Sequence, residues 1–569
     1  MKKFKIILWV LIFMLLLCAC GEVEPTATQP SLNTNPTNGS QPTDPVQQEH
    51  IHQWVDANCT SPKTCSACGA TEGTVTEHQY EELSRVEPGS NTYGSVTYGC
   101  NCGDSYVEQL PPTGSVGLEY SANGDGTYTL VGLGTCADTQ IFIPETHEGG
   151  AVTAIADRAF YDCGNITEVS IPGTIKKIGT QIFYKCTSLH TVYYSSTYGD
   201  SNNPFLNEPS IKKVVFAVST IPVGVCKNMT NIEEVVIQEG TTAIGNTAFN
   251  GCTNLKKVTL PSTLTSIGGF AFLGCKSLEE IQIPKRVAEI GPNAFYGCSG
   301  LTEFVIPEGV TVIKTNTFAF CSNLVTVNIP ASVQTIESNV FDQCTSLKSV
   351  HIPVGVSKLA GYVFYMCSSL ESITIPDTVT SIGNSAFWGC TSLKNLVIPD
   401  SVTKIGGGAF GRCSALTTIT IPERITVVEQ GVFSECSSLE EIIFQGNIES
   451  IGQRAFYGCT SLTRFVIPEG VTSVERCTFE SCTALKNIVI PDSVTTIGDY
   501  AFNNCKALEN VVMSCNVTTI GNCAFYCCEN LTQIQYGGTK AQWEAIEKGL
   551  SWNDKVKQCL INCSDGPIN

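Results

Sequence analysis

Histidine and tryptophan are scarce in this chain of 569 residues, which has six His and five Trp. Charged residues make up only 15%, and the net charge is −19. Beyond the first few residues Lys and Arg form no cluster, so the chain lacks the positive patch that nucleic acid phosphates require. The sequence also lacks a H-E-x-x-H motif, a Ser/His/Asp arrangement, a glycine-rich phosphate loop and a regular acidic calcium loop. These absences argue against an enzyme, a nucleic-acid-binding protein and a calcium- or nucleotide-dependent protein.

Cysteine, glycine and apolar residues are abundant by contrast, with 30 Cys, 50 Gly and 42% hydrophobic residues. That apolar fraction is enough to build a long core, so wholesale disorder is excluded.

The N-terminus has the pattern of an export signal. A short positive segment precedes an apolar run at 6–17, which is too short to cross about 30 Å of hydrocarbon. The motif LCAC at 17–20 resembles a bacterial lipoprotein signal, which implies that Cys20 becomes the lipidated mature N-terminus. An ordinary secretory peptide cleaved nearby is the alternative. We therefore expect a signal at 1–19 and a disordered Pro/Thr/Asn-rich tether at 20–49.

A small Cys/His-rich module is expected at 50–112. The pairs Cys65/Cys68 and Cys100/Cys102 each lie in a short turn that ends in Gly, and together they could hold a structural zinc ion. Disulfides formed after export are the second interpretation, and unpaired packed thiols are the third. None of the three implies catalysis, because four protein ligands close a metal site. The stretch also resembles small Cys/His modules on surface proteins of anaerobic bacteria, and no other cofactor is predicted.

A repeat of 23 residues dominates the rest of the chain. A Phe stands three residues before nearly every cysteine of the series, which predicts a regular internal ladder. Thirteen cysteines keep this spacing without a slip: Cys252, Cys275, Cys298, Cys321, Cys344, Cys367, Cys390, Cys413, Cys436, Cys459, Cys482, Cys505 and Cys528.

One copy of the repeat shows how a coil is built. Alternation over 278–283 predicts a short strand with one buried face, and Pro284 ends it because proline lacks an N–H. Ile290 points inward again, Gly291 allows a tight bend, and Phe295 closes the coil. Each copy leaves an apolar edge that only the next copy can cover. The sequence therefore predicts a solenoid of sixteen or seventeen coils with short parallel strands.

The pattern L-x-x-V-x-I-P-x-x-V-x-x-I-G-x-x-A-F-x-x-C resembles the BspA-like leucine-rich repeats, over roughly 117–563. The resemblance implies a cell-surface or secreted protein that binds other proteins, including host matrix components in some members. We expect a lead-in segment with the first coil at 113–162, a leucine-rich-repeat array at 163–536 and a C-terminal cap at 537–569. Residues 195–215 lose the motif and form either an insertion or a distorted coil.

Thirteen cysteines at a strict period indicate structure rather than redox or metal chemistry. Stacked coils would place these thiols in one buried line, where a small side chain with a weak S–H donor fits. Neighbouring side chains would point the same way, which does not favour the dihedral angle of a disulfide. We expect them to be reduced and packed.

The outward residue of each predicted strand forms a row without any Lys, Arg, Asp or Glu. Its second half is rich in β-branched residues, which either reflects strand propensity alone or marks a weakly apolar surface for a protein partner. The candidate partner-binding residues are Val397, Ile443, Val466, Val489 and Val512.

These features predict a non-enzymatic, lipid-anchored protein on a bacterial cell surface, which binds or adheres through its solenoid. Its expected partners are other proteins, such as host matrix components or surface proteins of neighbouring cells, and it meets the membrane only through the lipid. A structural spacer that presents the Cys/His module is one alternative. A surface hydrolase component with activity outside the repeats is the other.

Overall fold

The structure is a computed structural model that describes residues 54–55, 63–65, 71–72, 79–90, 94–110, 112–199, 205 and 208–568. Contacts along the chain group residues 1–80 and 100–104 into one compact unit, and residues 81–99 and 105–569 into another. The predicted module at 50–112 is therefore shared between two units. The predicted signal, Cys20 and the tether lie outside the described residues. Within the described part of the chain, no helix is long and apolar enough to cross a membrane.

The described strands of the first unit form a small antiparallel sheet in the order β1-β2-β3. They are β1 (Trp54–Val55), β2 (Lys63–Cys65) and β3 (Thr71–Glu72). The same unit contains the turn at 100–104, in which Cys100 N–H donates to the Asp104 carbonyl at 2.8 Å. Gly103 has a φ of 93° in this turn, so a Gly stands where the backbone is left-handed.

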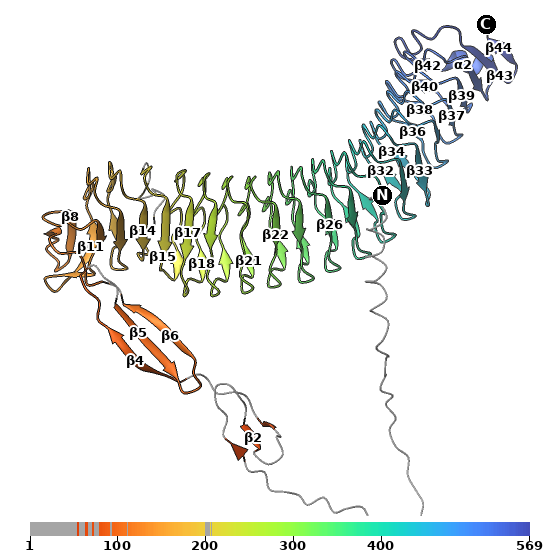
Figure 1. The fold of residues 1–569 in the computed structure, drawn as a ribbon. Coiled ribbons are helices and arrows are strands. Elements are labelled where there is room, and N and C mark those ends of the chain that lie inside the picture. The colour runs from red at the N-terminus through yellow and green to blue at the C-terminus, as the bar shows by residue number, and fades with distance from the viewer. Residues whose placement is uncertain are drawn as a thin grey trace, which may run out of the picture. The chain divides into compact units, whose positions relative to one another are not determined.

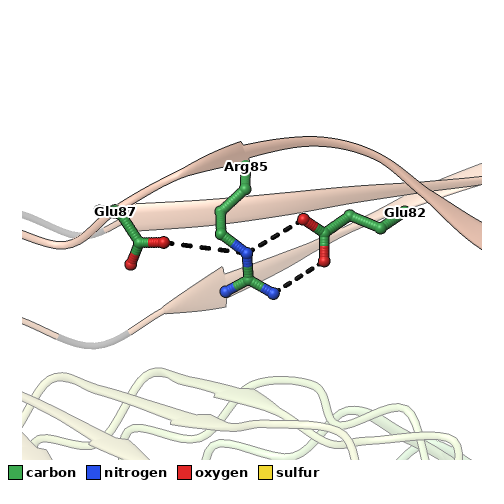
Figure 2. A network of polar contacts seen from close by, with 3 residues as sticks. All are labelled: Glu82, Arg85 and Glu87. Atoms are coloured by element: carbon green, nitrogen blue, oxygen red, sulfur yellow. Dashed lines mark hydrogen bonds and ion pairs between the residues drawn. The ribbon is translucent and has the colours of Figure 1, made fainter.

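A three-stranded sheet in the order β4-β5-β6 follows in the chain. Its strands are β4 (Tyr80–Val86), β5 (Gly94–Cys100) and β6 (Ser105–Leu110), and β5 and β6 pair antiparallel. Figure 2 shows the polar network on β4, where Arg85 donates to both carboxylate oxygens of Glu82 at 3.0 and 2.8 Å. Glu87 lies 3.9 Å from Arg85 Nε. These groups are exposed to solvent, so the network orders the strand surface and contributes little to stability.

Most coils of the second unit add a strand to a parallel main ladder, and the coils stack one upon another (Figure 1). The strands pair in register, for example Val466 with Val489 and Val489 with Val512. Strands of the main ladder are β9 (Gln140–Phe142), β12 (Glu168–Ile171), β14 (Thr191–Tyr194), β15 (Lys213–Phe216), β17 (Glu234–Ile237), β19 (Lys257–Thr259), β22 (Glu303–Val305), β24 (Thr326–Asn328), β26 (Ser349–His351), β28 (Ser372–Thr374), β31 (Thr418–Ile421), β33 (Glu441–Phe444), β35 (Arg464–Val466), β37 (Asn487–Ile490), β39 (Asn510–Met513), β41 (Gln533–Tyr536) and β43 (Leu560–Cys563).

The predicted solenoid is confirmed, with about 19 turns of roughly 23 residues in the part of the chain that is described. The sequence count of sixteen or seventeen coils was too low because the lead-in and the cap also add rungs through β9 and β43. The strand predicted at 278–283 is not formed, and the coil with Val397 also has no strand at 396–398. Leu396 and Ile398 are nevertheless buried while Val397 is exposed, so the inward and outward alternation persists without a strand.

A second ladder of two-residue strands runs along the coils at the Ile that precedes Gly in most repeats. The sequence placed Ile290 inward and Gly291 at a bend, but no strand was predicted at this point. A side chain at Gly291 would collide with the backbone N of Gly269 in the preceding coil, so Gly permits the close approach. These strands are β13 (Lys177–Ile178), β16 (Thr220–Ile221), β18 (Ala243–Ile244), β20 (Ser266–Ile267), β21 (Glu289–Ile290), β23 (Val312–Ile313), β25 (Thr335–Ile336), β27 (Lys358–Leu359), β29 (Ser381–Ile382), β30 (Lys404–Ile405), β32 (Val427–Val428), β34 (Ser450–Ile451), β36 (Ser473–Val474), β38 (Thr496–Ile497), β40 (Thr519–Ile520) and β42 (Glu547–Lys548).

Phenylalanine rings form the centre of the core. From Phe249 to Phe525, the centroids of successive ladder rings lie 5.1 to 5.8 Å apart, with interplanar angles of 3 to 21°. Rings in such stacked contact gain more than their buried area alone provides. The repeat of Phe at one position of each coil therefore becomes a continuous aromatic column.

The thirteen ladder cysteines lie beside this column as buried free thiols. From Cys275 to Cys528, each Sγ donates to the carbonyl of the Phe 26 residues earlier, at 3.0 to 3.3 Å. Burial raises the pKa of these thiols far above the ordinary value, for example that of Cys390, so they stay protonated and unreactive. Each thiol thus gives a second donor to a Phe carbonyl that also accepts from a backbone amide, as Cys298 Sγ and Cys275 N–H both donate to the Phe272 carbonyl.

The irregular stretch keeps the ladder register, which favours the distorted coil over the insertion. β14 and β15 pair along their whole length, and the ring of Phe205 stacks on that of Phe183 at 6.3 Å. Glu208 follows three residues later, in the slot that a ladder cysteine occupies elsewhere. The amide of Glu208 donates to the Phe205 carbonyl, which is the turn that the other coils make between Phe and Cys.

Separate elements close the two ends of the stack. The lead-in strands are β7 (Glu119–Ala122), β8 (Tyr128–Gly132), β10 (Thr146–His147) and β11 (Gly150–Ile155), which pair in the order β10-β11-β8-β7. At the other end, α2 (Lys540–Ala545) is capped by Thr539, and β44 (Gly566–Ile568) pairs antiparallel with β43. A hairpin and a helix thus cover the last coil, whose apolar edge would otherwise face water.

Candidate protein-binding surface

The exposed face of the main ladder carries an unbroken apolar row near the C-terminal end. Its members are Ile443, Val466, Val489 and Val512, which lie in the four successive strands β33, β35, β37 and β39. Each is exposed, and Val466 reaches 77% exposure. Strand pairing places Val489 between Val466 and Val512, and the row then passes into Gln535 of β41. When a partner covers these neighbouring valines, apolar surface is removed from water, which favours binding.

Val397 stands apart from this apolar row. It is 80% exposed, but Thr420 of the next coil is half-buried and separates it from Ile443. The structure therefore brings four of the five predicted partner-binding residues together and leaves the fifth two coils away. Val305, at 60% exposure, is a further isolated member of the same sequence row.

An acidic row that the sequence analysis missed runs beside the strand ends. It consists of exposed carboxylates that directly follow the proline in five repeats, and Gly446 interrupts it between the third and the fourth: Asp377, Asp400, Glu423, Glu469 and Asp492. None of them forms an ion pair within the described residues. The recurring Ile-Pro-Asp and Ile-Pro-Glu motifs were the signal that could have revealed this row. On the other flank of the strands, Glu441 and Arg464 lie 3.8 Å apart, so charges of both signs occur there.

The apolar and acidic rows meet at a shallow hollow beside the cap. Its volume is about 580 Å³, and its lining includes Glu469, Val489, Asp492, Val512 and Tyr536. Apolar side chains and carboxylates without an ion-pair partner among the described residues thus line the same space. A partner segment that carries both apolar and basic side chains would complement this surface.

Comparison with known proteins places the repeat in a described family. The description "BspA type leucine rich repeat region" matches residues 136–224, 219–348, 313–440 and 427–547, in six copies. The chain belongs to the BspA-type leucine-rich-repeat family. The matched segments together cover well over half of the chain, as the resemblance of the repeat pattern had implied.

Solved structures similar to this BspA-type chain include other bacterial repeat proteins. A leucine-rich repeat protein from Bacteroides ovatus is 26% identical, covering 78% of this chain and 98% of its own, with a TM-score of 0.51. A leucine rich cell surface protein from Faecalibacterium prausnitzii is 25% identical over 77% of this chain and 98% of its own, with a TM-score of 0.31. The first supports the solenoid fold. No curated protein matches the chain.

The predicted metal ligands of this BspA-type chain are only partly described. Cys65 ends β2 and Cys68 lies outside the described residues, while Cys100 and Cys102 stand at the hairpin turn between β5 and β6. Both cysteine pairs fall within the ranges of the first compact unit. No group of three or more His, Cys, Asp or Glu suited to a metal ion occurs among the described residues. Zinc, disulfides and unpaired thiols all stay predictions for this segment.

Proposed function

We propose that this BspA-type chain is a bacterial cell-surface protein that binds other proteins through the apolar row and the neighbouring acidic row. The observation that carries the proposal is the side-by-side pairing of Val466, Val489 and Val512, with Ile443 in the preceding coil. Glu469 and Asp492, which form no ion pair within the described residues, line the same hollow as two of these valines. Covering such side chains releases apolar surface from water, and the carboxylates select partners with basic residues. Extracellular matrix proteins and surface proteins of neighbouring cells are the expected partner classes, and adhesion is the expected consequence.

Binding of such a partner depends on the exposed valines. We expect the double variant Val466→Asp/Val489→Asp to bind at least tenfold more weakly, because each Asp removes apolar contact and must lose water on binding. The measurement is surface plasmon resonance of the mature chain over immobilised matrix proteins and extracted bacterial surface proteins. A second variant, Glu469→Lys/Asp492→Lys, should weaken the same interactions and reduce their dependence on salt.

A matched control lies on the same row in earlier coils. Asn328→Asp/Thr374→Asp changes two exposed strand residues outside the apolar row and should leave binding unchanged. Circular dichroism establishes that all variants fold alike. Equal binding of the valine variant and the control to every captured protein would contradict the proposal.

We further propose that a lipid on Cys20 holds the chain at the membrane surface. The support is the positive segment, the short apolar run and the LCAC motif. Several acyl chains, at about 0.8 kcal/mol per buried methylene, anchor a protein stably. Expression in a bacterial host should leave the wild-type chain in the detergent-soluble membrane fraction, whereas Cys20→Ser should release it as a soluble or uncleaved form. Wild-type protein in the soluble fraction with no attached lipid by mass spectrometry would rule the anchor out.

A further inference from the structure

A hollow of about 650 Å³ opens on the array away from the main ladder, where the coils turn around each Phe. In several coils the residue that follows the ladder Phe is aromatic, as Tyr365, Trp388 and Tyr457 show. Between Trp388 and Tyr457, two successive coils have Gly411 and Ser434 at this position. The Trp388 ring occupies the place of a side chain at Gly411, and the small Ser434 leaves open the remaining space between Trp388 and Tyr457.

A second row of small residues deepens the same hollow. Two residues before the ladder Phe the backbone is left-handed, with φ of 58° at Tyr362 and 56° at Arg454. Gly408 and Gly431 occupy this position in the two coils that carry Gly411 and Ser434, with φ of 66° and 65°. Glycine adopts this conformation without strain and carries no side chain into the space. The two rows together shape a basin two coils wide.

The aromatic walls of this basin are held in place by their neighbours. The Trp388 ring packs against Gly411, where any side chain would collide with it. The Arg412 guanidinium lies 5.8 Å from the centroid of the Trp388 ring and donates to both oxygens of Glu435, at 2.9 and 3.3 Å. At the other end, Arg454 lies 5.9 Å from the centroid of the Tyr457 ring. Rings ordered in this way lose little freedom when a ligand packs on them.

Polar groups without partners point to the chemistry of the ligand. The side chains of Glu429 and Gln430 line the hollow and make no hydrogen bond within the described residues. Asn384 Oδ1 accepts from Gly407 N–H at 3.1 Å, which leaves its amide N–H groups available. A carboxylate, a carboxamide oxygen and amide donors together match the paired donor and acceptor capacity of hydroxyl groups.

The charges of the hollow are balanced. Glu435 is neutralised by Arg412, and the remaining lining residues of opposite sign are Glu429 and Arg454. The lining of the hollow is therefore close to neutral. A neutral lining disfavours a charged occupant such as a phosphate, a carboxylate or a lysine side chain. The volume lies within the roughly 300–1,000 Å³ typical of small-molecule sites.

We propose that this hollow is a saccharide-binding site for one or two neutral sugar rings, in addition to the protein-binding surface on the main ladder. The C–H face of a sugar ring is slightly positive and packs on the negative face of Trp388 or Tyr457. Its hydroxyl groups bond to Glu429, Gln430 and Asn384. Glycans on cells or in the extracellular environment carry such neutral rings, so the site gives the solenoid a second class of ligand.

Isothermal titration calorimetry of the mature chain with neutral trisaccharides tests the proposal. Maltotriose, cellotriose and tri-N-acetylchitotriose serve as probes, with trilysine and trigalacturonate as charged comparators. We expect saturable binding of at least one neutral trisaccharide and at least tenfold weaker binding by Trp388→Ala. Because loss of Trp388 removes packing, Ser434→Tyr is the second variant: it fills the hollow with the residue that Tyr457 supplies in the next coil. It should fold and bind at least tenfold more weakly.

Tyr296→Ala is the matched control, since Tyr296 occupies the same position of an earlier coil and should not affect binding. The proposal is overturned if none of the neutral trisaccharides binds saturably. It is equally overturned if Ser434→Tyr binds a trisaccharide as tightly as the wild type. Binding of trilysine or trigalacturonate in preference to every neutral probe would replace the saccharide by a charged ligand.

Discussion

Replacement of Phe364 by alanine should lower the free energy of unfolding by about 3–5 kcal/mol. Phe364 is fully buried at the middle of the aromatic column. Its ring lies 5.5 Å from that of Phe341 and 5.4 Å from that of Phe387. The substitution removes the ring from water-excluded packing, leaves a cavity and breaks two stacked contacts at once. Urea denaturation followed by circular dichroism measures the change.

The loss of stability in Phe364→Ala should also be confined to the coils around the substitution. A solenoid coil contacts only its neighbours, so a weakened coil lowers the stability of the interfaces on its two sides first. Hydrogen exchange should therefore accelerate most between 341 and 387, and much less around Phe272. Phe270→Ala is the matched control, because Phe270 is an exposed Phe in the same array and should change stability by less than about 1 kcal/mol. A loss at position 364 as small as that of the control would contradict the continuous column.

The strict period made the core predictable from the sequence. Phe295 and Cys298 recur at the same spacing in many copies, so each coil places these two side chains at the same point. Stacking of the coils then produces the aromatic column and the line of thiols. Outward residues such as Val466 were predictable for the same reason, since a strand with one buried face exposes every second side chain.

Features that depend on two coils at once were harder to predict. The second ladder requires the backbone at Gly291 to approach that of Gly269 in the preceding coil closely. From the sequence, Gly291 predicted only a tight bend. The hollow between Trp388 and Tyr457 exists because Gly431 and Ser434 are small. No sequence motif marks a place where large side chains are absent. In the Cys/His segment no period relates Cys65 to Cys100, so nothing in the spacing selects among zinc, disulfides and free thiols.

In the irregular coil, a change in repeat length prevented the sequence pattern from identifying the Phe and Cys positions. The coil is one residue shorter, so Phe205 and Glu208 fall outside the 23-residue count although their spacing of three matches Phe and Cys elsewhere. Glu208 is only 5% exposed, and its Oε1 is buried without a hydrogen bond within the described residues. Burial raises the pKa of the Glu208 carboxyl to about 7. Burial also raises the pKa of the nearby Cys186 thiol to about 12, so this neighbour stays protonated and neutral.

Stability should consequently fall as the pH rises from about 4.5 to 7. In the unfolded chain Glu208 loses its proton near its ordinary pKa, while in the folded chain it keeps the proton until about pH 7. The folded state therefore binds more protons within this window, and the free energy of unfolding decreases with pH there and is level above it. At about 1.4 kcal/mol per pH unit the decrease reaches roughly 3 kcal/mol.

Glu208→Cys, which restores the residue of the other coils, should abolish this decrease and stabilise the protein at pH 8 by roughly 2–3 kcal/mol. A cysteine at this slot remains neutral across the range and can donate to a carbonyl of the preceding coil, as Cys186 donates to Phe160 at 2.9 Å. Urea denaturation at pH 5, 6, 7 and 8 measures the difference between variant and wild type. Glu280→Gln, at an exposed carboxyl of a regular coil, should follow the wild-type curve. Parallel pH curves for Glu208→Cys and the wild type would mean that Glu208 is ionised in the folded protein and reaches solvent or a cation.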